Sequence, residues 1–178
     1  MARRIDTNCM GWTYKSFASV VALATILLAG CWEQTDVISI KSDGSTTFKT
    51  DVVITEKGFS VKDIEELTSG FMKDLKSAGW QVEKKWVSRS EPFRLSFSGK
   101  GNIRKVKSAS AFYRIQKINE STYSIVFIPA KTQGGRSSRT IKFEREFFGG
   151  GAKILDERGN EVKEIENVSE SQTYKVVF

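Results

Sequence analysis

The feature that most constrains this chain is the alternation of apolar and polar side chains on both sides of an Asp-Gly pair. Residues 38–40 alternate, Asp43-Gly44 follows, and residues 46–54 alternate again. A period of two with one polar face is typical of an antiparallel strand that lies on a core. Asp-Gly favours a two-residue hairpin turn, because both turn positions need positive φ. The sequence therefore predicts a β-hairpin here.

One helix is expected after the hairpin, over residues 61–78. Ser60 and Asp63 have the S-x-x-D spacing of a capping box, and Gly79 is a natural residue just past a helix end. Between them, apolar residues recur at spacings of three and four. This stripe either packs on the core or binds a membrane surface. Because the first turn is acidic and anionic lipid would repel it, we expect core packing. The stripe consists of Val61, Ile64, Leu67, Phe71 and Leu75.

The rest of the chain has the pattern of further strands. Gly99-Lys100-Gly101-Asn102 is expected to break one of them. One helix and many strands predict an α+β domain: an antiparallel sheet of about eight strands with one amphipathic helix (61–78) packed on it. The further strands are expected within residues 80–87, 93–98, 112–115, 123–128, 140–148, 152–155, 161–165 and 172–178.

The N-terminus has the order of a targeting signal. Arg3, Arg4 and Lys15 precede an uncharged apolar run of 14 residues, 17–30. This run is shorter than the roughly 20 residues that a membrane-spanning helix needs. A basic start, a short apolar core and small residues at its end predict a cleavable signal peptide.

The last residues of this run, Leu28-Ala29-Gly30, and the next one, Cys31, resemble the lipobox of bacterial lipoproteins. The resemblance implies cleavage before Cys31 and attachment of lipid to its thiol, with palmitate-type acyl chains as the anchor. The alternative is an ordinary secretory signal followed by a chance cysteine. No other anchor is evident in the sequence.

The lipobox resemblance divides the chain into a signal peptide (1–30), a short tether with the lipidated cysteine (31–35) and a single domain (36–178). It implies a protein that is lipid-anchored in the bacterial cell envelope. Trp32 stands where an aspartate would resemble an inner-membrane retention signal. In a bacterium with two membranes we therefore expect the outer membrane, with the domain facing the periplasm.

A second resemblance, to LppM-type lipoprotein domains, covers residues 31–100. It implies a curved sheet that cradles a helix, with an apolar cavity for lipid. It transfers no site residue to this chain. The features that carry it are the lipobox cysteine, the hairpin turn at Asp43-Gly44, the helix end at Ala78-Gly79 and the following Trp80-Gln81-Val82.

Composition argues against an enzyme. The chain has no histidine, and its two cysteines are Cys9 in the leader and Cys31 at the lipidation site. The mature domain therefore lacks the commonest general base, the commonest metal ligand and any free thiol. We expect no cofactor and no metal. A carboxylate-dependent hydrolase remains the enzymatic alternative, and its candidates are Glu65-Glu66, Glu144 with Glu146 and Asp156-Glu157.

Basic side chains are concentrated in one window of the sequence. Residues 84–142 contain 14 Lys and Arg but only two acidic residues. They form either a basic face for an anionic partner or a solvated surface whose charges mix in three dimensions. Within the window, Lys131, Arg136 and Arg139 lie in an expected loop with glycines. We expect this loop to contact phosphate or carboxylate groups.

The sequence therefore favours a non-enzymatic binding or interaction module. Its partners would be the membrane, through the N-terminal lipid, and an anionic lipid, a glycan or an acidic protein. Nucleic acid fits the expected compartment poorly. The alternatives are a lipid-binding carrier with a cavity between sheet and helix and the carboxylate-dependent hydrolase.

Overall fold

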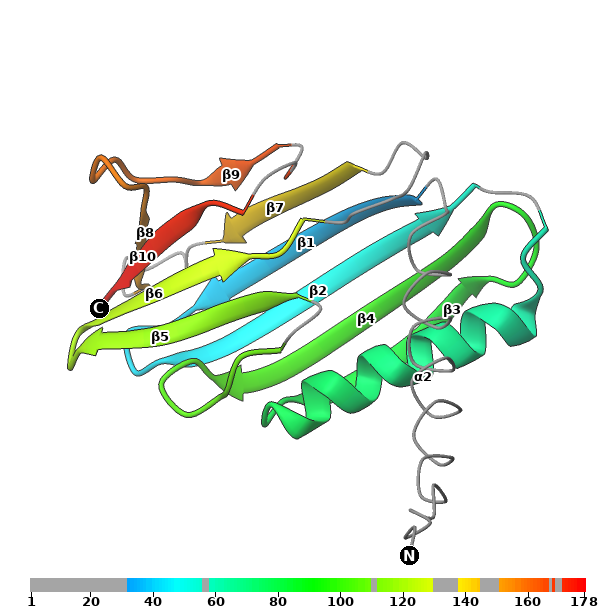
Figure 1. Ribbon diagram of the computed structural model, residues 1–178, viewed down its shortest axis with the longest axis horizontal. Coiled ribbons are helices and arrows are strands. Elements are labelled where there is room, and N and C mark those ends of the chain that lie inside the picture. Colours follow the sequence, from blue (N-terminus) through cyan, green and yellow to red (C-terminus); the bar gives the residue numbers. More distant parts are fainter. Residues whose placement is uncertain are drawn as a thin grey trace, which may run out of the picture.

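The domain is built from ten strands and one helix in the part of the chain that the structure describes. The computed structural model describes residues 32–55, 58–109, 112–129, 138–144, 151–166, 168 and 171–178 (Figure 1). The elements are β1 (Trp32–Ile40), β2 (Ser45–Ile54), α2 (Val61–Ser77), β3 (Gln81–Ser88), β4 (Phe93–Asn102), β5 (Tyr113–Asn119), β6 (Thr122–Phe127), β7 (Ser138–Glu144), β8 (Lys153–Leu155), β9 (Glu164–Ile165) and β10 (Thr173–Val177).

The strands form two sheets. A six-stranded sheet has the order β3-β4-β2-β1-β7-β9, and a four-stranded sheet has the order β5-β6-β10-β8. The α+β class is confirmed, but the expectation of one antiparallel sheet of about eight strands is wrong. Neighbouring strands pair antiparallel except β1 and β7, which are parallel. The pairing of β1 with β7 joins the first strand of the domain to a strand about 100 residues later, which no local pattern predicts.

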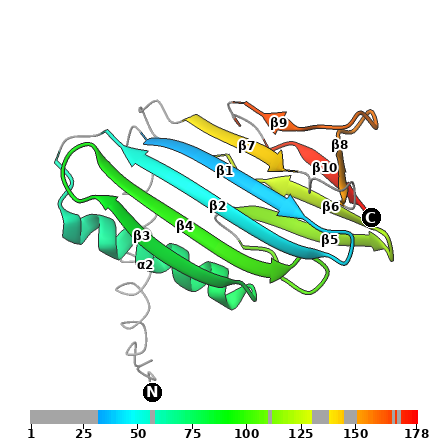
Figure 2. The same ribbon diagram turned by 180° about the vertical axis from the view of Figure 1, so that it is seen from behind.

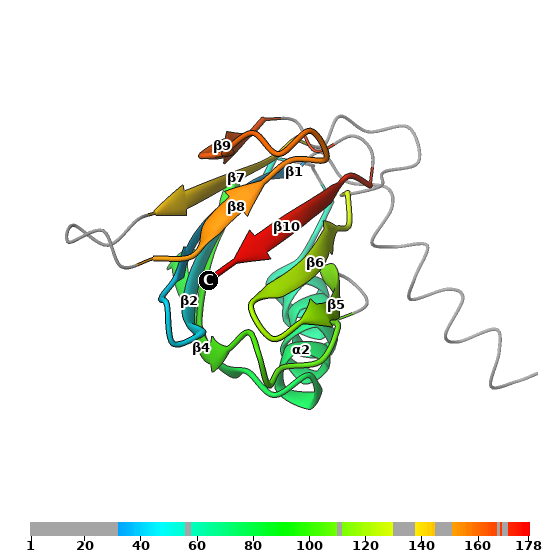
Figure 3. The same ribbon diagram turned by 90° about the vertical axis from the view of Figure 1, so that its left-hand side faces the viewer.

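The four-stranded sheet and α2 cover the same face of the six-stranded sheet. Figure 3 shows the large sheet on one side and these two elements together on the other. Figure 2 shows the large sheet from behind, with no described element over its outer face. A single helix is too narrow to cover six strands, since its diameter is about 10–12 Å and strands lie about 4.8 Å apart. The second sheet supplies the rest of the cover.

The hairpin predicted around Asp43-Gly44 is confirmed, but its loop is longer than the expected two residues, because it is closed by the bond from the N–H of Lys41 to the carbonyl of Ser45 at 2.8 Å. Strands β1 and β2 pair from Ile40 with Thr46 to Trp32 with Ile54. Gly44 adopts a φ of 84°, and the backbone N–H of Ser45 donates to the Asp43 carboxylate at 2.8 Å. Residues 32–35, expected as a tether, are instead the start of β1. Cys31 lies outside the described residues.

The helix expectation is confirmed to within one residue at its C-terminal end. The hydroxyl of Ser60 accepts from the N–H of Asp63, and the N–H of Ser60 donates to the Asp63 carboxylate at 2.8 Å. The helix ends at Ser77, with Ala78 as its C-cap. Within the predicted stripe, Ile64 and Leu75 are buried, whereas Val61, Leu67 and Phe71 are only partly buried.

The glycines that were expected to end a strand lie inside β4, so that expectation is wrong. A Cβ atom on Gly99 would lie 2.1 Å from Cε1 of Phe48, and one on Gly101 would lie 2.8 Å from Cε3 of Trp80. The two rings meet edge to face with centroids 5.2 Å apart. The glycines therefore admit a close aromatic pair rather than a turn.

The core consists of two connected regions on the inner face of the large sheet. The region beneath α2 contains Val52, Ile54, Ile64, Phe93, Leu95 and Phe97. The larger region lies mainly between the two sheets and includes Ile40, Leu75, Trp80, Phe112, Tyr113, Tyr123, Ile125, Phe127, Ile141, Ile154, Tyr174 and Val176. Within the described chain, no helix is both long and apolar enough to cross a membrane.

Candidate functional site: a cavity between the sheets

The space between the two sheets contains an apolar cavity of about 50 Å³. The large sheet, the small sheet and the C-terminal half of α2 all contribute to its wall. The wall is almost entirely aromatic and aliphatic, with a polar group at one end. The lining residues are Asp36, Ile38, Ile40, Thr46, Phe48, Thr50, Leu75, Trp80, Ile103, Phe112, Tyr113, Ile125, Phe127, Arg139, Phe143, Ile154 and Val176.

The polar end of the cavity is a buried ion pair between β1 and β7. The Nε of Arg139 lies 2.7 Å from Oδ2 of Asp36, and the two side chains are 5% and 4% exposed, respectively. Alternation along β1 points Asp36 to the same face as Ile38 and Ile40, which are core residues. A carboxylate there needs a partner, because an unpaired charge in an apolar interior is strongly unfavourable.

The carboxylate of Asp36 is saturated with hydrogen bonds. Oδ1 accepts from Nε2 of Gln34 at 3.0 Å and from Oγ1 of Thr50 at 2.6 Å. Oδ2 accepts from the same Gln34 amide at 3.0 Å and from Arg139. The strand register produces this cluster, since Asp36 pairs with Thr50 on β2, and Gln34 pairs with Arg139 on β7. The pair is thus held rigidly and carries no net charge.

Arg139 also connects the two sheets. Its Nη1 donates to the backbone carbonyl of Phe112 at 3.1 Å and to that of Ile128. These carbonyls flank the start of β5 and the end of β6, and Ile128 also donates its N–H to Phe112. Asp36 therefore orients a guanidinium that fastens the small sheet to the large one at this end of the cavity.

A second polar contact in the wall joins Trp80 and Tyr113. The indole N–H of Trp80 donates to the hydroxyl of Tyr113 at 2.5 Å, and that hydroxyl donates to the carbonyl of Lys107 at 2.9 Å. Burial raises the pKa of Tyr113 to about 12. The phenol is therefore neutral at physiological pH and serves as a structural hydrogen-bond relay.

The sequence-predicted anionic-binding loop needs a correction. Arg139 was expected in an exposed loop, but it lies in β7, where it is buried and paired with Asp36. Lys131 and Arg136 lie outside the described residues, as does Cys31, so their expected roles stay predictions. Asp36 was missed because its partner is 103 residues away. Its one signal was a carboxylate on the apolar side of an alternating strand.

The basic window does not form one face within the described chain. Lys85, Arg94 and Lys100 occupy outward positions on the large sheet, whereas Arg114 lies on the outer side of the small sheet. Arg139 is buried between the sheets. Strand alternation and the two-layer architecture therefore distribute these charges over different surfaces.

The acidic pairs considered for hydrolysis are not gathered in the cavity. The carboxylate of Glu65 forms an ion pair with Lys84 and accepts from Nε1 of Trp86, and these bonds lower its pKa. Asp156 holds a turn by accepting from Asn160. Glu144 is exposed on β7, and Glu146 lies outside the described residues. Among the described side chains, no group of three or more potential metal ligands is present.

Comparison with known proteins adds no assignment, because no protein-family model and no curated protein matches the chain. The function is therefore argued from the chain itself.

Proposed function

We propose that the protein is a lipid-anchored envelope protein that acts as a non-enzymatic binding module, and that its ligand is an alkyl chain received between the two sheets. The lipobox-like segment ending at Cys31 supports the anchor and the envelope location. In a bacterium with two membranes, the outer membrane is the favoured site, with the domain in the periplasm. The observation that carries the binding proposal is the apolar cavity between the layers.

The size of the cavity limits what it holds in this closed form. Its volume of about 50 Å³ exceeds the roughly 10–15 Å³ that one water requires, but its wall is too apolar to hold water well. Ligand pockets for whole small molecules are about 300–1,000 Å³. The cavity therefore admits the end of an alkyl chain, and a longer stretch would enter only as the sheets move apart.

The layers are arranged in a way that permits such movement. In the described residues no strand of the four-stranded sheet pairs with a strand of the six-stranded sheet, and a backbone link between them lies at the β8 edge, where Lys41 bridges Gly151 and the N–H of Ala152 donates to the carbonyl of Ile40. Apolar side chains and the Arg139 bonds to Phe112 and Ile128 hold the two together at the cavity. Apolar contacts between layers are non-directional, so they can re-form around an alkyl chain of similar character.

A pair of neighbouring substitutions tests the site. Ile38 lines the cavity, whereas Val37 is on the outer face of the same strand. Ile38→Phe should fill the cavity and weaken the uptake of a fluorescent fatty acid by about tenfold or more, which corresponds to about 1.4 kcal/mol or more. Val37→Phe is the control and should bind like the wild type. If both variants are folded, as thermal melting would show, and bind the fatty acid equally, the cavity is not the binding site.

A further inference from the structure

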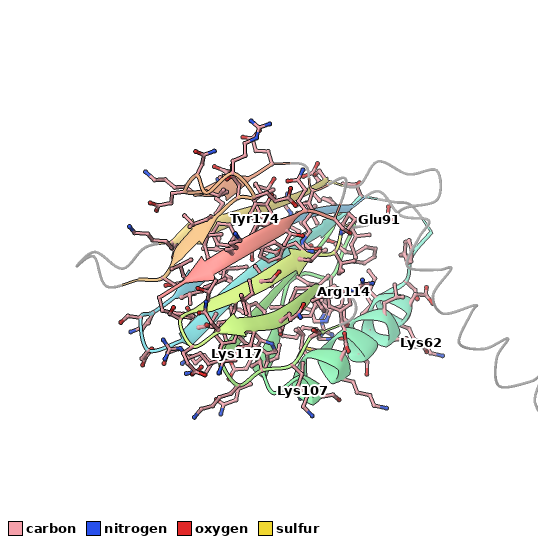
Figure 4. All side chains as sticks on the ribbon, turned by 60° about the vertical axis from the view of Figure 1, so that its left-hand side comes forward. Lys62, Glu91, Lys107, Arg114, Lys117 and Tyr174 are labelled. Carbon is pink, nitrogen blue, oxygen red and sulfur yellow. The ribbon has the colours of Figure 1, made fainter. Side chains whose placement is uncertain are left out.

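The outer face of the four-stranded sheet has an unusual charge distribution. Alternation points Tyr113, Ile125, Tyr174 and Ile154 inward and the residues between them outward. Figure 4 looks onto this side of the molecule and labels Arg114 on β5. We call the outward set the small-sheet face: Arg114, Gln116, Thr122, Ser124, Val126, Lys153, Leu155, Thr173, Lys175 and Val177.

The ten strand positions that define the small-sheet face carry only positive charges. Arg114, Lys153 and Lys175 are exposed, and one acidic side chain, Glu161, lies at the β8 edge of the face, where it bridges Leu155. Among the described residues, no ion pair involves any of these three side chains. A face with three cations within it and an acidic side chain at its edge has a net positive charge and attracts anionic groups.

The outer face of the six-stranded sheet is different. It carries cations too, but acidic side chains accompany them. Lys49 pairs with Asp51 at 2.8 Å, and Lys142 pairs with Glu164 at 3.0 Å. Glu83 lies outward on β3, next to Lys85 two residues on. The two exposed sheet surfaces therefore differ in charge pattern although both are rich in Lys or Arg.

Apolar side chains lie among the cations of the small-sheet face. Val126 is directly opposite Arg114, Leu155 opposite Lys175, and Val177 opposite Lys153. These three apolar residues are partly exposed. In addition, Ile118, in the bulge of the edge strand β5, is 53% exposed. Cations interleaved with aliphatic groups match the headgroup region of an anionic bilayer, where charge and apolar surface are both accommodated.

We infer that the small-sheet face docks on the surface of an anionic lipid bilayer. The inner side of the same four strands lines the cavity, so the docked sheet would separate the bilayer from the proposed alkyl site by a single layer. The inference rests on the proposed function in one respect, which is the choice of partner. If the cavity takes its ligand from a bilayer, a lipid surface is favoured over an acidic protein or a glycan. Its electrostatic argument stands on the charges of the face.

The test uses the full-length protein reconstituted into vesicles and an environment-sensitive fluorophore on a single introduced cysteine. Ser124→Cys reports from the small-sheet face, and Ser98→Cys reports from the outer face of the six-stranded sheet. Protein without either substitution supplies the background from native thiols. The vesicles consist either of zwitterionic phosphatidylcholine alone or of phosphatidylcholine with roughly 30% phosphatidylglycerol, an anionic lipid.

Docking predicts that the label at position 124 shifts to the blue and is quenched by lipid-attached quenchers in the anionic vesicles only. The shift should disappear at about 1 M salt, where screening acts within about 3 Å. Replacing Arg114, Lys153 and Lys175 together with Gln should lower the docking equilibrium constant about 100-fold. The matched control replaces Lys85, Arg94 and Lys100 with Gln, which removes the same charge from the other sheet, and should leave docking unchanged.

Three results would overturn the inference: a label at position 124 that stays aqueous, an equal shift at position 98, or equal docking by the two triple variants. A fluorescence change of the label at position 124 with soluble heparin but not with vesicles would also overturn the inference, because the face would then bind a polyanion rather than a bilayer. None of these results depends on fatty-acid uptake by the cavity, so docking and the proposed function can fail separately.

Discussion

At the scale of single residues, the buried pair of Asp36 and Arg139 organises the interior. Each carboxylate oxygen of Asp36 accepts two hydrogen bonds, and Arg139 reaches backbone carbonyls of the second sheet. A buried ion pair does not by itself prove stabilisation, because desolvation offsets the attraction of the charges. Removing one partner is different, since it leaves the other charge buried and unpaired.

Asp36→Asn should therefore lower the free energy of unfolding by about 3–5 kcal/mol. The matched control is Asp51→Asn on the opposite face of the same sheet, where Asp51 pairs with Lys49 in an exposed position. Exposed pairs contribute about 0–1 kcal/mol, so the control should stay close to the wild type. Urea unfolding followed by tryptophan fluorescence measures both. Equal midpoints for the two variants would contradict the structural role of the buried pair.

At the scale of elements, local signals predicted local structure and failed where partners are distant. The turn at Asp43-Gly44 and the capping box of Ser60 and Asp63 are complete within a few residues, and both are confirmed. The division into two sheets could not be predicted, because it depends on pairings such as that of β1 with β7. Arg139 was misplaced for the same reason, since its burial depends on the distant Asp36 and on carbonyls of the second sheet.

The capping box of α2 should make helix stability depend on pH in acid. Hydrogen bonding to Ser60 lowers the pKa of Asp63 from its ordinary value of 3.8. A carboxyl with a depressed folded-state pKa stabilises the fold above its unfolded pKa, and that contribution is lost as the pH falls through the folded value. The contribution of Asp63 should thus be complete at pH 7 and should be lost as the pH falls below 3.8 and through the lower folded-state pKa.

Thermal melting between pH 7 and pH 2 checks this expectation against Asp63→Asn. Because Asn cannot titrate, the variant should melt below the wild type at pH 7, and the gap should narrow as the pH falls. A gap that stays constant over the whole range would show that the ionised carboxylate of Asp63 adds nothing to the helix.

At the scale of the whole molecule, the domain consists of two layers with an apolar cavity between them, and the proposed lipid anchor precedes the first strand directly. The inner layer surfaces build the cavity, and the outer surfaces differ in charge. The cavity could not be located from the sequence, because its wall combines residues from seven strands, α2 and the segments between them. The sequence did contain the alternation that makes each layer apolar on one side.

The proposed lipid anchor is tested by Cys31→Ser. The variant should be neither cleaved before this position nor lipidated, because the thiol is the acceptor in the lipobox-like segment. Metabolic labelling with a fatty-acid analogue, followed by gel analysis of the purified protein, gives the answer. Two attached chains are expected, since a single chain binds membranes only weakly. Fatty-acid label that persists in the variant would show that the lipid is attached to another residue, which would contradict Cys31 as the acceptor.

The central claim is that the space between the sheets takes an alkyl chain, and the most direct measurement is mass spectrometry of the native protein purified from its membrane in a mild detergent. The account predicts a non-covalent lipid at about one per protein, retained by the Val37→Phe control and depleted in Ile38→Phe. The N-terminal anchor is covalent and stays with the polypeptide, so it does not confuse the result. A folded wild-type protein that carries no extractable lipid, or carries the same lipid in both variants, would contradict the claim.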